Sequence, residues 1–177
     1  MRNIIVFDLE TQYTADEVGG WQNIREMRLA VGVTYNAGTN IYRDYTEEEA
    51  DYLIATLRTA DLVVGYNVLR FDYEVLRAYT DDPLSDLPTA DMLKDLYQTL
   101  GWRPKLDNVA AATLGEGKSA DGLQAVRWFR QGQLDKVMAY CRRDVEVTYQ
   151  VYQFGRRNGY VQVRDRRWRV HKVPVRW

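Results

Sequence analysis

Asn3-Ile4-Ile5-Val6-Phe7-Asp8-Leu9-Glu10-Thr11 is the stretch that most constrains the fold of this chain. A short apolar run of this kind is typical of a central strand that is covered on both faces. Side chains alternate between the two faces of a strand, so Asp8 and Glu10 should point the same way near its carboxyl end. Such a pair alone is more often a solvated strand end than a site, so its interpretation depends on the rest of the chain.

The segments that follow extend this strand into a sheet. Residues 29–35 and 40–45 have strand patterns, and Asn36-Ala37-Gly38-Thr39 between them suits a hairpin turn. With the first strand they predict an antiparallel three-stranded unit. Residues 62–65, Leu-Val-Val-Gly, predict another short buried strand. Thr46 followed by three glutamates indicates a helix start, because its hydroxyl can cap the helix and the acids lie near the positive end of the dipole.

The remainder of the chain has mainly helical patterns separated by Gly and Pro. The predicted helices cover residues 47–59, 70–79, 92–100, 106–114, 123–130 and 134–154. The last of them carries an apolar stripe that should pack against the sheet. Residues 160–163 and 168–173 are candidates for two terminal strands.

Length and composition indicate one globular domain. The 177 residues are 46% hydrophobic and 28% charged, which is ordinary for a soluble protein, and no stretch has the apolar length of a membrane span. We expect a domain at residues 1–158 and a basic C-terminal extension at 159–177 with the pattern of a small hairpin. Cys141 is the only cysteine, and the N-terminal segment lacks the cleavage region of a signal peptide. A cytoplasmic protein without a membrane role is therefore expected.

The formal net charge of −1 conceals an asymmetry between the two ends of the chain. Residues 156–177 contain eight Arg or Lys and one acid, whereas the preceding residues contain 16 basic and 24 acidic residues. A basic segment beside an acidic body suits a surface that follows phosphates, since Lys and Arg neutralise them. A solvated amphipathic hairpin explains the same charges equally well.

Two further segments carry candidate chemistry. Tyr140 and Asp144 lie four residues apart on the last predicted helix and therefore on one face of it. Asp72 lies at the start of a predicted helix, where an acid can simply stabilise the helix dipole. If these acids join Asp8 and Glu10, each buried carboxylate loses hydration and repels the others, so a cation must lie among them.

These three segments together resemble motifs I, II and III of the DEDD superfamily of 3′-to-5′ exonucleases. The motifs are Phe7-Asp8-Leu9-Glu10-Thr11, Asn67-x3-Phe71-Asp72 and Tyr140-x3-Asp144. The third is similar to the tyrosine subtype, which also occurs in the proofreading domains of family B DNA polymerases. The histidine subtype needs His at the position that Ala139 occupies, and the only histidine is His171.

Other segments resemble those of stand-alone predicted bacterial and phage exonucleases of this type, namely residues 16–21, 106–110 and 113–115 with Lys118. The resemblance implies an α/β, ribonuclease H-like fold, with a central mixed five-stranded sheet flanked by helices. It also implies hydrolysis of phosphodiester bonds by a two-metal-ion mechanism that releases 5′-monophosphates.

The residue roles that the resemblance implies are specific. Asp8 would bridge two divalent ions, Glu10 and Asp144 would complete the site that activates water, and Asp72 would support the second ion. Tyr140 would orient the attacking water. Oxygen ligands without Cys or His favour Mg²⁺ or Mn²⁺.

Several residues are candidates for contacts with the substrate: Asn67, Phe71, Trp21, Lys118 and Arg143. Asn67 and Phe71 could line a 3′-nucleotide pocket, although core packing explains Phe71 equally well. Trp21 follows two glycines in an expected loop, where it could stack on a base. Lys118 and Arg143, with Arg142 beside it, could contact phosphates, although solvated lysines and arginines are more common.

The expected partner is single-stranded DNA or RNA with a free 3′ end, with DNA favoured because the tyrosine subtype resembles polymerase-associated domains. A helicase or polymerase acting in trans could deliver the substrate. Two alternatives stay open at this point. One is a structure-selective endonuclease on the same fold, and the other is a catalytically idle module that binds nucleic acid or protein.

Overall fold

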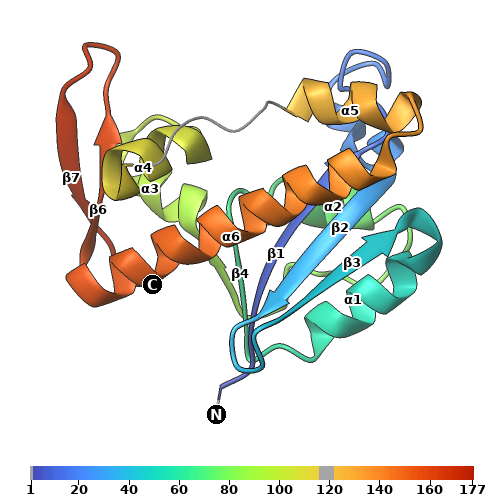
Figure 1. Ribbon diagram of the computed structural model, residues 1–177, viewed down its shortest axis with the longest axis horizontal. Helices are drawn as coiled ribbons and strands as arrows, with labels where there is room; N and C mark the ends of the chain where they lie inside the picture. The colour runs from blue at the N-terminus through green and yellow to red at the C-terminus, as the bar shows by residue number, and fades with distance from the viewer. Residues whose placement is uncertain (1, 116–121) are drawn as a thin grey trace.

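A mixed five-stranded sheet forms the centre of the computed structural model, which describes residues 2–115 and 122–177 (Figure 1). The strands are β1 (Ile4–Thr11), β2 (Leu29–Asn36), β3 (Ile41–Thr46), β4 (Leu62–Gly65) and β5 (Thr89–Asp91), arranged in the order β3-β2-β1-β4-β5. β1 pairs antiparallel with β2 and parallel with β4, so the strand that carries Asp8 and Glu10 is central. The predicted fold class is confirmed.

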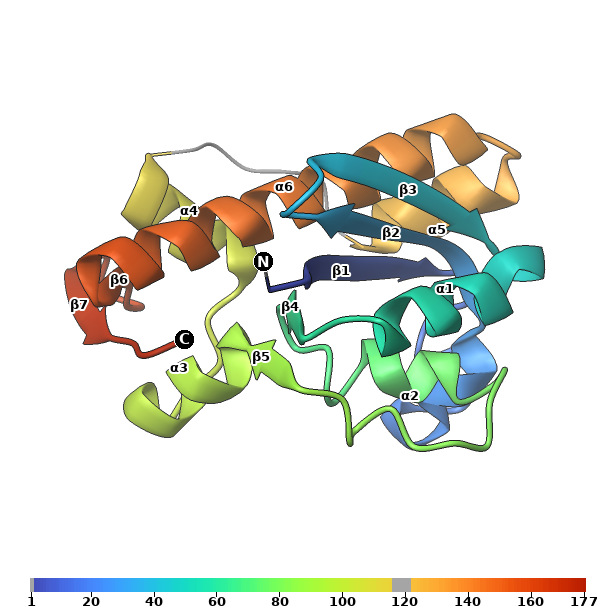
Figure 2. The ribbon, with the colours of Figure 1, turned by 90° about the horizontal axis from the view of Figure 1, so that it is seen from below.

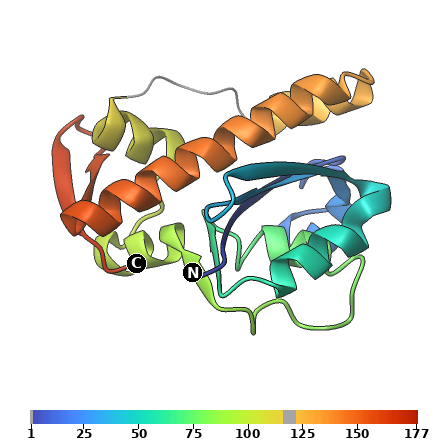
Figure 3. The same cartoon turned by 60° about the horizontal axis from the view of Figure 1, so that its bottom comes forward.

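The α-helices lie on both faces of this sheet. They are α1 (Ala50–Arg58), α2 (Asp72–Leu76), α3 (Met92–Leu100), α4 (Leu106–Leu114), α5 (Gly122–Arg130) and α6 (Leu134–Asn158), together with the 3₁₀ helices η1 (Trp21–Met27) and η2 (Glu47–Glu49). Figure 2 shows α5 and α6 on one side of the sheet and α1 and α2 on the other. In Figure 3 the long α6 crosses the whole molecule from the sheet to the C-terminal hairpin.

Each face of the sheet has its own core because β1 alternates between the two faces. Val6 belongs to the cluster under α6, which includes the predicted stripe residues Val137, Cys141 and Val145. Phe7 belongs to the cluster under α1 and α2. Asp8 and Glu10 share the parity of Val6, so they face α6.

The first helix begins as its sequence predicts. Thr46 and Glu49 form a capping box, in which the backbone N–H of Thr46 donates to Oε2 of Glu49 at 3.0 Å. The chain then passes through η2 into α1, whose last residue, Arg58, precedes the C-cap Thr59. Reciprocal bonds of this kind satisfy backbone donors that a helix start leaves open.

Some element boundaries differ from the sequence prediction. The helix expected at 70–79 is only Asp72–Leu76. Arg77 is its C-cap, and the side chain of Tyr79 instead forms hydrogen bonds with residues outside the helix. The Tyr79 hydroxyl donates to Glu47 and accepts from the backbone N–H of Leu29. The expected loop at Trp21 is the start of η1, and no strand was predicted at residues 89–91, where β5 lies.

The C-terminal residues form a second, two-stranded sheet. β6 (Tyr160–Arg164) and β7 (Val170–Pro174) pair antiparallel, as the pattern at 160–173 predicts. Valines of this hairpin, Val161, Val163 and Val173, are buried in the cluster under α6. The division of the chain at residue 158 stays a prediction.

Within residues 2–115 and 122–177, none of the helices is both long and apolar enough to cross a membrane.

Candidate active site

The carboxylates of β1 meet those of α6 at one point. One ligand oxygen each of Asp8, Glu10 and Asp144 lies within 4.8 Å of the other two. Glu10 is only 8% exposed, and Asp8 and Asp144 are half-buried. The side chains that the sequence placed on one face of a strand and on one face of a helix are therefore brought together.

Tyr140 lies beside this group, one helical turn before Asp144. A hydrogen bond joins the Tyr140 hydroxyl to the Asp144 carboxylate, as their spacing on α6 predicts. Burial raises the pKa of Tyr140, and the negative charges of Asp144 and Glu10 raise it further, so the phenol keeps its proton. Trp128 of α5 packs edge-on against the Tyr140 ring, with 6.2 Å between ring centroids, and so fixes its orientation.

Asp72 is adjacent to the group of three but is held differently. It is 2% exposed at the start of α2, and its Oδ1 accepts the backbone N–H of Leu9 at 3.1 Å. Leu9 lies between Asp8 and Glu10 in β1, so this bond fastens Asp72 directly to the strand that carries the other two acids. Asp72 is not among the three carboxylates whose oxygens lie within 4.8 Å.

Burial makes the cluster unfavourable when it is fully ionised. Burial raises the pKa of Asp8 well above its ordinary value, and the neighbouring carboxylates, Asp72 foremost, add to the shift. Burial raises the pKa of Glu10 in the same way. It also raises the pKa of Asp72 to about 8, although backbone hydrogen bonds oppose the shift. Each shift expresses the cost of grouping negative charges away from water.

A divalent cation fits this site by charge and by ligand chemistry. It would neutralise charges that otherwise repel one another, and carboxylate oxygens are the ligands that Mg²⁺ and Mn²⁺ prefer. Asp8, Glu10 and Asp144 are therefore the residues that could hold a metal ion.

Cys141 is a member of the site that the sequence placed only in the apolar stripe of α6. Its buried thiol donates weakly to Asp8, with Sγ 3.4 Å from the backbone oxygen and 3.6 Å from Oδ2. Burial raises the pKa of the Cys141 thiol, and the negative charge of Asp8 adds to the shift, so the sulfur stays protonated. Its position next to Tyr140 on α6 was the signal, but a helical stripe cannot show which strand residue it meets.

The loop that carries Asn67 is fixed by an acid that the sequence analysis missed. Asp91, 4% exposed at the end of β5, accepts the backbone N–H groups of Asn67 at 2.8 Å and Leu69 at 3.1 Å. Asn67 has a left-handed backbone with φ of 74°, a conformation that Asn tolerates better than most non-glycine residues. Its side-chain oxygen accepts a hydrogen bond from Arg103.

Phe71 and Trp21 are neighbours, which the sequence could not reveal. Their ring centroids are 6.2 Å apart in an edge-on arrangement, and Trp21 is 68% exposed. Phe71 is half-buried against the core under α2 and immediately precedes Asp72. An exposed aromatic surface therefore stands next to the loop between β4 and α2.

The predicted phosphate contacts on α6 are engaged elsewhere in the structure. Arg143 forms an ion pair with Glu146 at 2.7 Å on the exposed side of the helix. Arg142 pairs with Asp44 of β3 at 2.6 Å, which ties α6 to the edge of the sheet. Lys118 lies outside the described residues.

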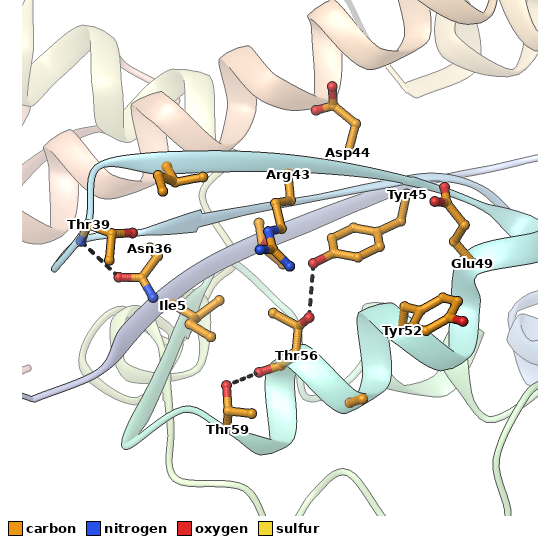
Figure 4. Close-up of a pocket in the computed structure, with 13 residues that line it drawn as sticks. Ile5, Asn36, Thr39, Arg43, Asp44, Tyr45, Glu49, Tyr52, Thr56 and Thr59 are labelled. Carbon is orange, nitrogen blue, oxygen red and sulfur yellow. Dashed lines mark hydrogen bonds between the residues drawn. The ribbon is translucent and has the colours of Figure 1, made fainter.

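A separate hollow of about 720 Å³ opens on the opposite face, between β3 and α1 (Figure 4). Arg43 points into it, and the Tyr45 hydroxyl is 3.0 Å from that of Thr56. Asp44 points away from it, toward α6. The three carboxylates that could hold a metal ion, Asp8, Glu10 and Asp144, lie instead on the α6 face.

Comparisons with known proteins bear on the family and the fold of this chain. A family model described as the RNase_H superfamily matches residues 5–154. Among solved structures, the family B DNA polymerase from the hyperthermophilic archaeon Pyrobaculum calidifontis is similar, with a TM-score of 0.60 and 15% identity over 88% of this chain. The matched region is 24% of the polymerase chain, and at this identity the likeness is one of fold. No curated protein matches the sequence.

Proposed function

The chain belongs to the RNase_H superfamily, and we propose that it is a metal-dependent 3′-to-5′ exonuclease of the DEDD group, tyrosine subtype. The observation that carries the proposal is the convergence of Asp8, Glu10 and Asp144, with ligand oxygens within 4.8 Å of one another. The bond between Tyr140 and Asp144 supports the tyrosine subtype.

The proposed chemistry is hydrolysis of a phosphodiester bond with release of a 5′-monophosphate. Asp8, Glu10 and Asp144 would hold the divalent ions, and Asp72 would support them from its place against β1. Mg²⁺ or Mn²⁺, when bound, would lower the pKa of a coordinated water and stabilise negative charge on the attacking and leaving oxygens. Tyr140, kept protonated by its surroundings, orients the attacking water through a hydroxyl that Asp144 holds in place.

The substrate of the proposal is the 3′ end of single-stranded nucleic acid, with DNA favoured over RNA. Phe71 and Trp21 offer an aromatic surface for the terminal base beside Asp72, and stacking of this kind tolerates any sequence. Asn67, held in a fixed backbone conformation by Asp91, offers its side chain at the same loop. Delivery of the strand by a helicase or polymerase in trans is part of the proposal.

The proposal is tested by incubating the protein with 5′-labelled single-stranded DNA or RNA of equal sequence, in Mg²⁺, Mn²⁺ or EDTA, and resolving the products on a sequencing gel. The expected result is a ladder that shortens from the 3′ end, needs metal, and disappears in Asp8→Asn. The matched control is Asp135→Asn, because Asp135 is an exposed acid in the first turn of α6, away from the cluster.

Other product patterns would replace the proposal. Discrete internal cuts that depend on Asp8 would show an endonuclease on the same fold. Intact substrate under every condition, with metal binding unaffected by Asp8→Asn, would show an idle binding module. Equal activity of the wild type and Asp8→Asn would remove the carboxylate cluster from the chemistry.

A further inference from the structure

A basic groove lies at the tip of the C-terminal hairpin, outside the carboxylate site. Its volume is about 630 Å³, and it is lined by Trp102, Arg103, Asp165, Arg166, Arg167 and Arg169. The first two residues belong to the segment between α3 and α4, and the others belong to the turn between β6 and β7. We refer to it as the tip groove.

The hairpin wall of the tip groove is fixed in place, because side chains of α4 fasten it to the body of the protein. Asn108 of α4 bonds to both backbone groups of Arg164, at 2.9 and 2.8 Å, and Thr113 does the same with Gln162 at 3.0 and 2.9 Å. At the turn, Oδ1 of Asp165 accepts the backbone N–H groups of Arg167 and Arg169. The arginines therefore lie on a hydrogen-bonded turn of the hairpin.

The charge balance of the tip groove is strongly positive. Four arginines face one acid, Asp165, which already pairs with Arg169 at 2.8 Å and with His171. Within residues 2–115 and 122–177, no hydrogen bond or ion pair engages the guanidinium groups of Arg166 and Arg167. Two cations are therefore available to an external anion.

Arg103 connects the tip groove to the carboxylate site. Arg103 lines the groove, and its guanidinium donates to the side chain of Asn67. Asn67 belongs to the loop that leads to Asp72. These contacts offer a strand whose 3′ end lies at the carboxylates a path past Asn67 and Arg103 to the hairpin tip.

Trp168 provides a separate indication that the tip has a binding role. It is 78% exposed at the hairpin turn, and its backbone φ is 62°. A left-handed conformation favours Gly or Asn, so a large exposed aromatic residue there costs stability and gains no burial. An exposed indole among arginines suits stacking on a base.

We infer that the tip groove binds the phosphates of the substrate strand upstream of the nucleotide being removed, with Trp168 stacking on one of its bases. The inference rests on the proposed function, since it takes the 3′ end to lie at Asp8 and its neighbours. It assigns to Arg103, Arg166 and Arg167 a role in holding long strands that the chemistry itself does not need.

Binding is tested with a 5′-fluorescein single-stranded DNA of about 16 nucleotides, near the upper end of site sizes for such strands. Anisotropy is measured in EDTA across about 50 to 200 mM salt, with Asp8→Asn as the parent so that no strand is consumed. Loss of two phosphate contacts in Arg166→Ala/Arg167→Ala should reduce the slope of log Kd against log salt by about 1.4. Over this fourfold range the parent then loses about sevenfold more affinity than the variant.

The matched control is Arg156→Ala/Arg157→Ala, which removes the same charge from the last turn of α6. Figure 1 places that turn at the opposite end of the hairpin from its tip. The control should keep the parent slope. A second variant, Trp168→Gly, suits the φ of 62° and should raise the melting temperature while weakening binding by about fivefold or more.

Hydrolysis separates this inference from the proposed function. With otherwise wild-type protein and metal, Arg166→Ala/Arg167→Ala should raise KM for the long strand and leave hydrolysis of a dinucleotide unchanged, because a dinucleotide does not reach the tip. Equal salt slopes for parent, tip variant and control, in a protein whose wild type degrades the strand, would overturn the inference alone. A wild type that hydrolyses neither substrate would instead overturn the proposed function.

Discussion

Asp91→Asn is the substitution that best tests how the Asn67 loop is held. Oδ1 of Asp91 accepts the backbone N–H groups of Asn67, Leu93 and Lys94, and Oδ2 accepts that of Leu69. Asn caps a helix about as well as Asp, so its remaining oxygen keeps the start of α3 intact. Its amide nitrogen, however, cannot accept the Leu69 N–H, so one bond of the loop is lost.

The magnitude follows from that one bond. A buried donor left without a partner costs about 1 to 3 kcal/mol, and the bonds that remain lose the strengthening that an ionised acceptor gives. A total of about 2 to 3 kcal/mol corresponds to a fall in melting temperature of about 4 to 12 °C for a domain of this size. The turnover number should fall as well, because displacement of a positioning loop by about 1 Å can cost about 100-fold.

The assay is thermal unfolding by circular dichroism, combined with strand hydrolysis at a temperature where both proteins are folded. Asp95→Asn is the matched control, since Asp95 is on the same helix and no hydrogen bond to its carboxylate is seen in the described residues. It should change stability by less than about 0.5 kcal/mol. An unchanged melting temperature for Asp91→Asn, or a lowered one with full turnover, would refute the positioning role.

Three further predictions follow from other contacts. Burial opposes ionisation of Glu47, but hydrogen bonds from Tyr79, Gln12 and Arg28 outweigh it and lower the pKa of Glu47 below its ordinary value of 4.5. That stabilisation is present above the unfolded pKa of Glu47 and is lost as pH falls through the folded pKa. Glu47→Gln should therefore lower the free energy of unfolding by about 1 to 2 kcal/mol at pH 7 and by little in acid. Urea unfolding at several pH values measures this, and a loss of stability that is independent of pH would contradict it. Tyr140→Phe should lower the turnover number about 10- to 100-fold with Mn²⁺ affinity kept, whereas parallel losses in both would make the phenol a support of the metal site only. A Cβ at Gly65 would lie 2.2 Å from Cγ1 of Val68, so Gly65→Ala should destabilise the protein by about 1 to 3 kcal/mol in urea titration, and wild-type stability would show that the loop yields.

The sequence patterns predicted those helices and strands whose ends are determined by neighbouring residues. The helices at 92–100 and 106–114 were predicted with their observed bounds, because Gly101 and Gly115 end them in left-handed conformations that favour glycine. The strand pair around residues 36–39 followed from its turn residues in the same way. Asp8 and Glu10 were predicted to share a face because the strand period is two.

Contacts between segments far apart in the sequence could not be predicted from local patterns. Asp91 has the sequence pattern of an ordinary helix cap, and its bonds to Asn67 and Leu69 exist only because β5 lies beside β4. β5 itself has three residues, too few for a periodic pattern to show. Arg103 meets Asn67 across 36 positions, and nothing in the local sequence predicts that pairing.

The grouped carboxylates should bind metal ions, and Mn²⁺ titration calorimetry of the metal-free protein measures that binding. We expect Mn²⁺ binding with release of protons near pH 7, because burial holds the pKa values of Asp8 and Glu10 high and that of Asp72 at about 8. Asp8→Asn should abolish binding, and Asp135→Asn should leave it unchanged. A wild type that takes up no Mn²⁺, or an Asp8→Asn variant that binds it equally well, would show that these carboxylates do not form a metal site.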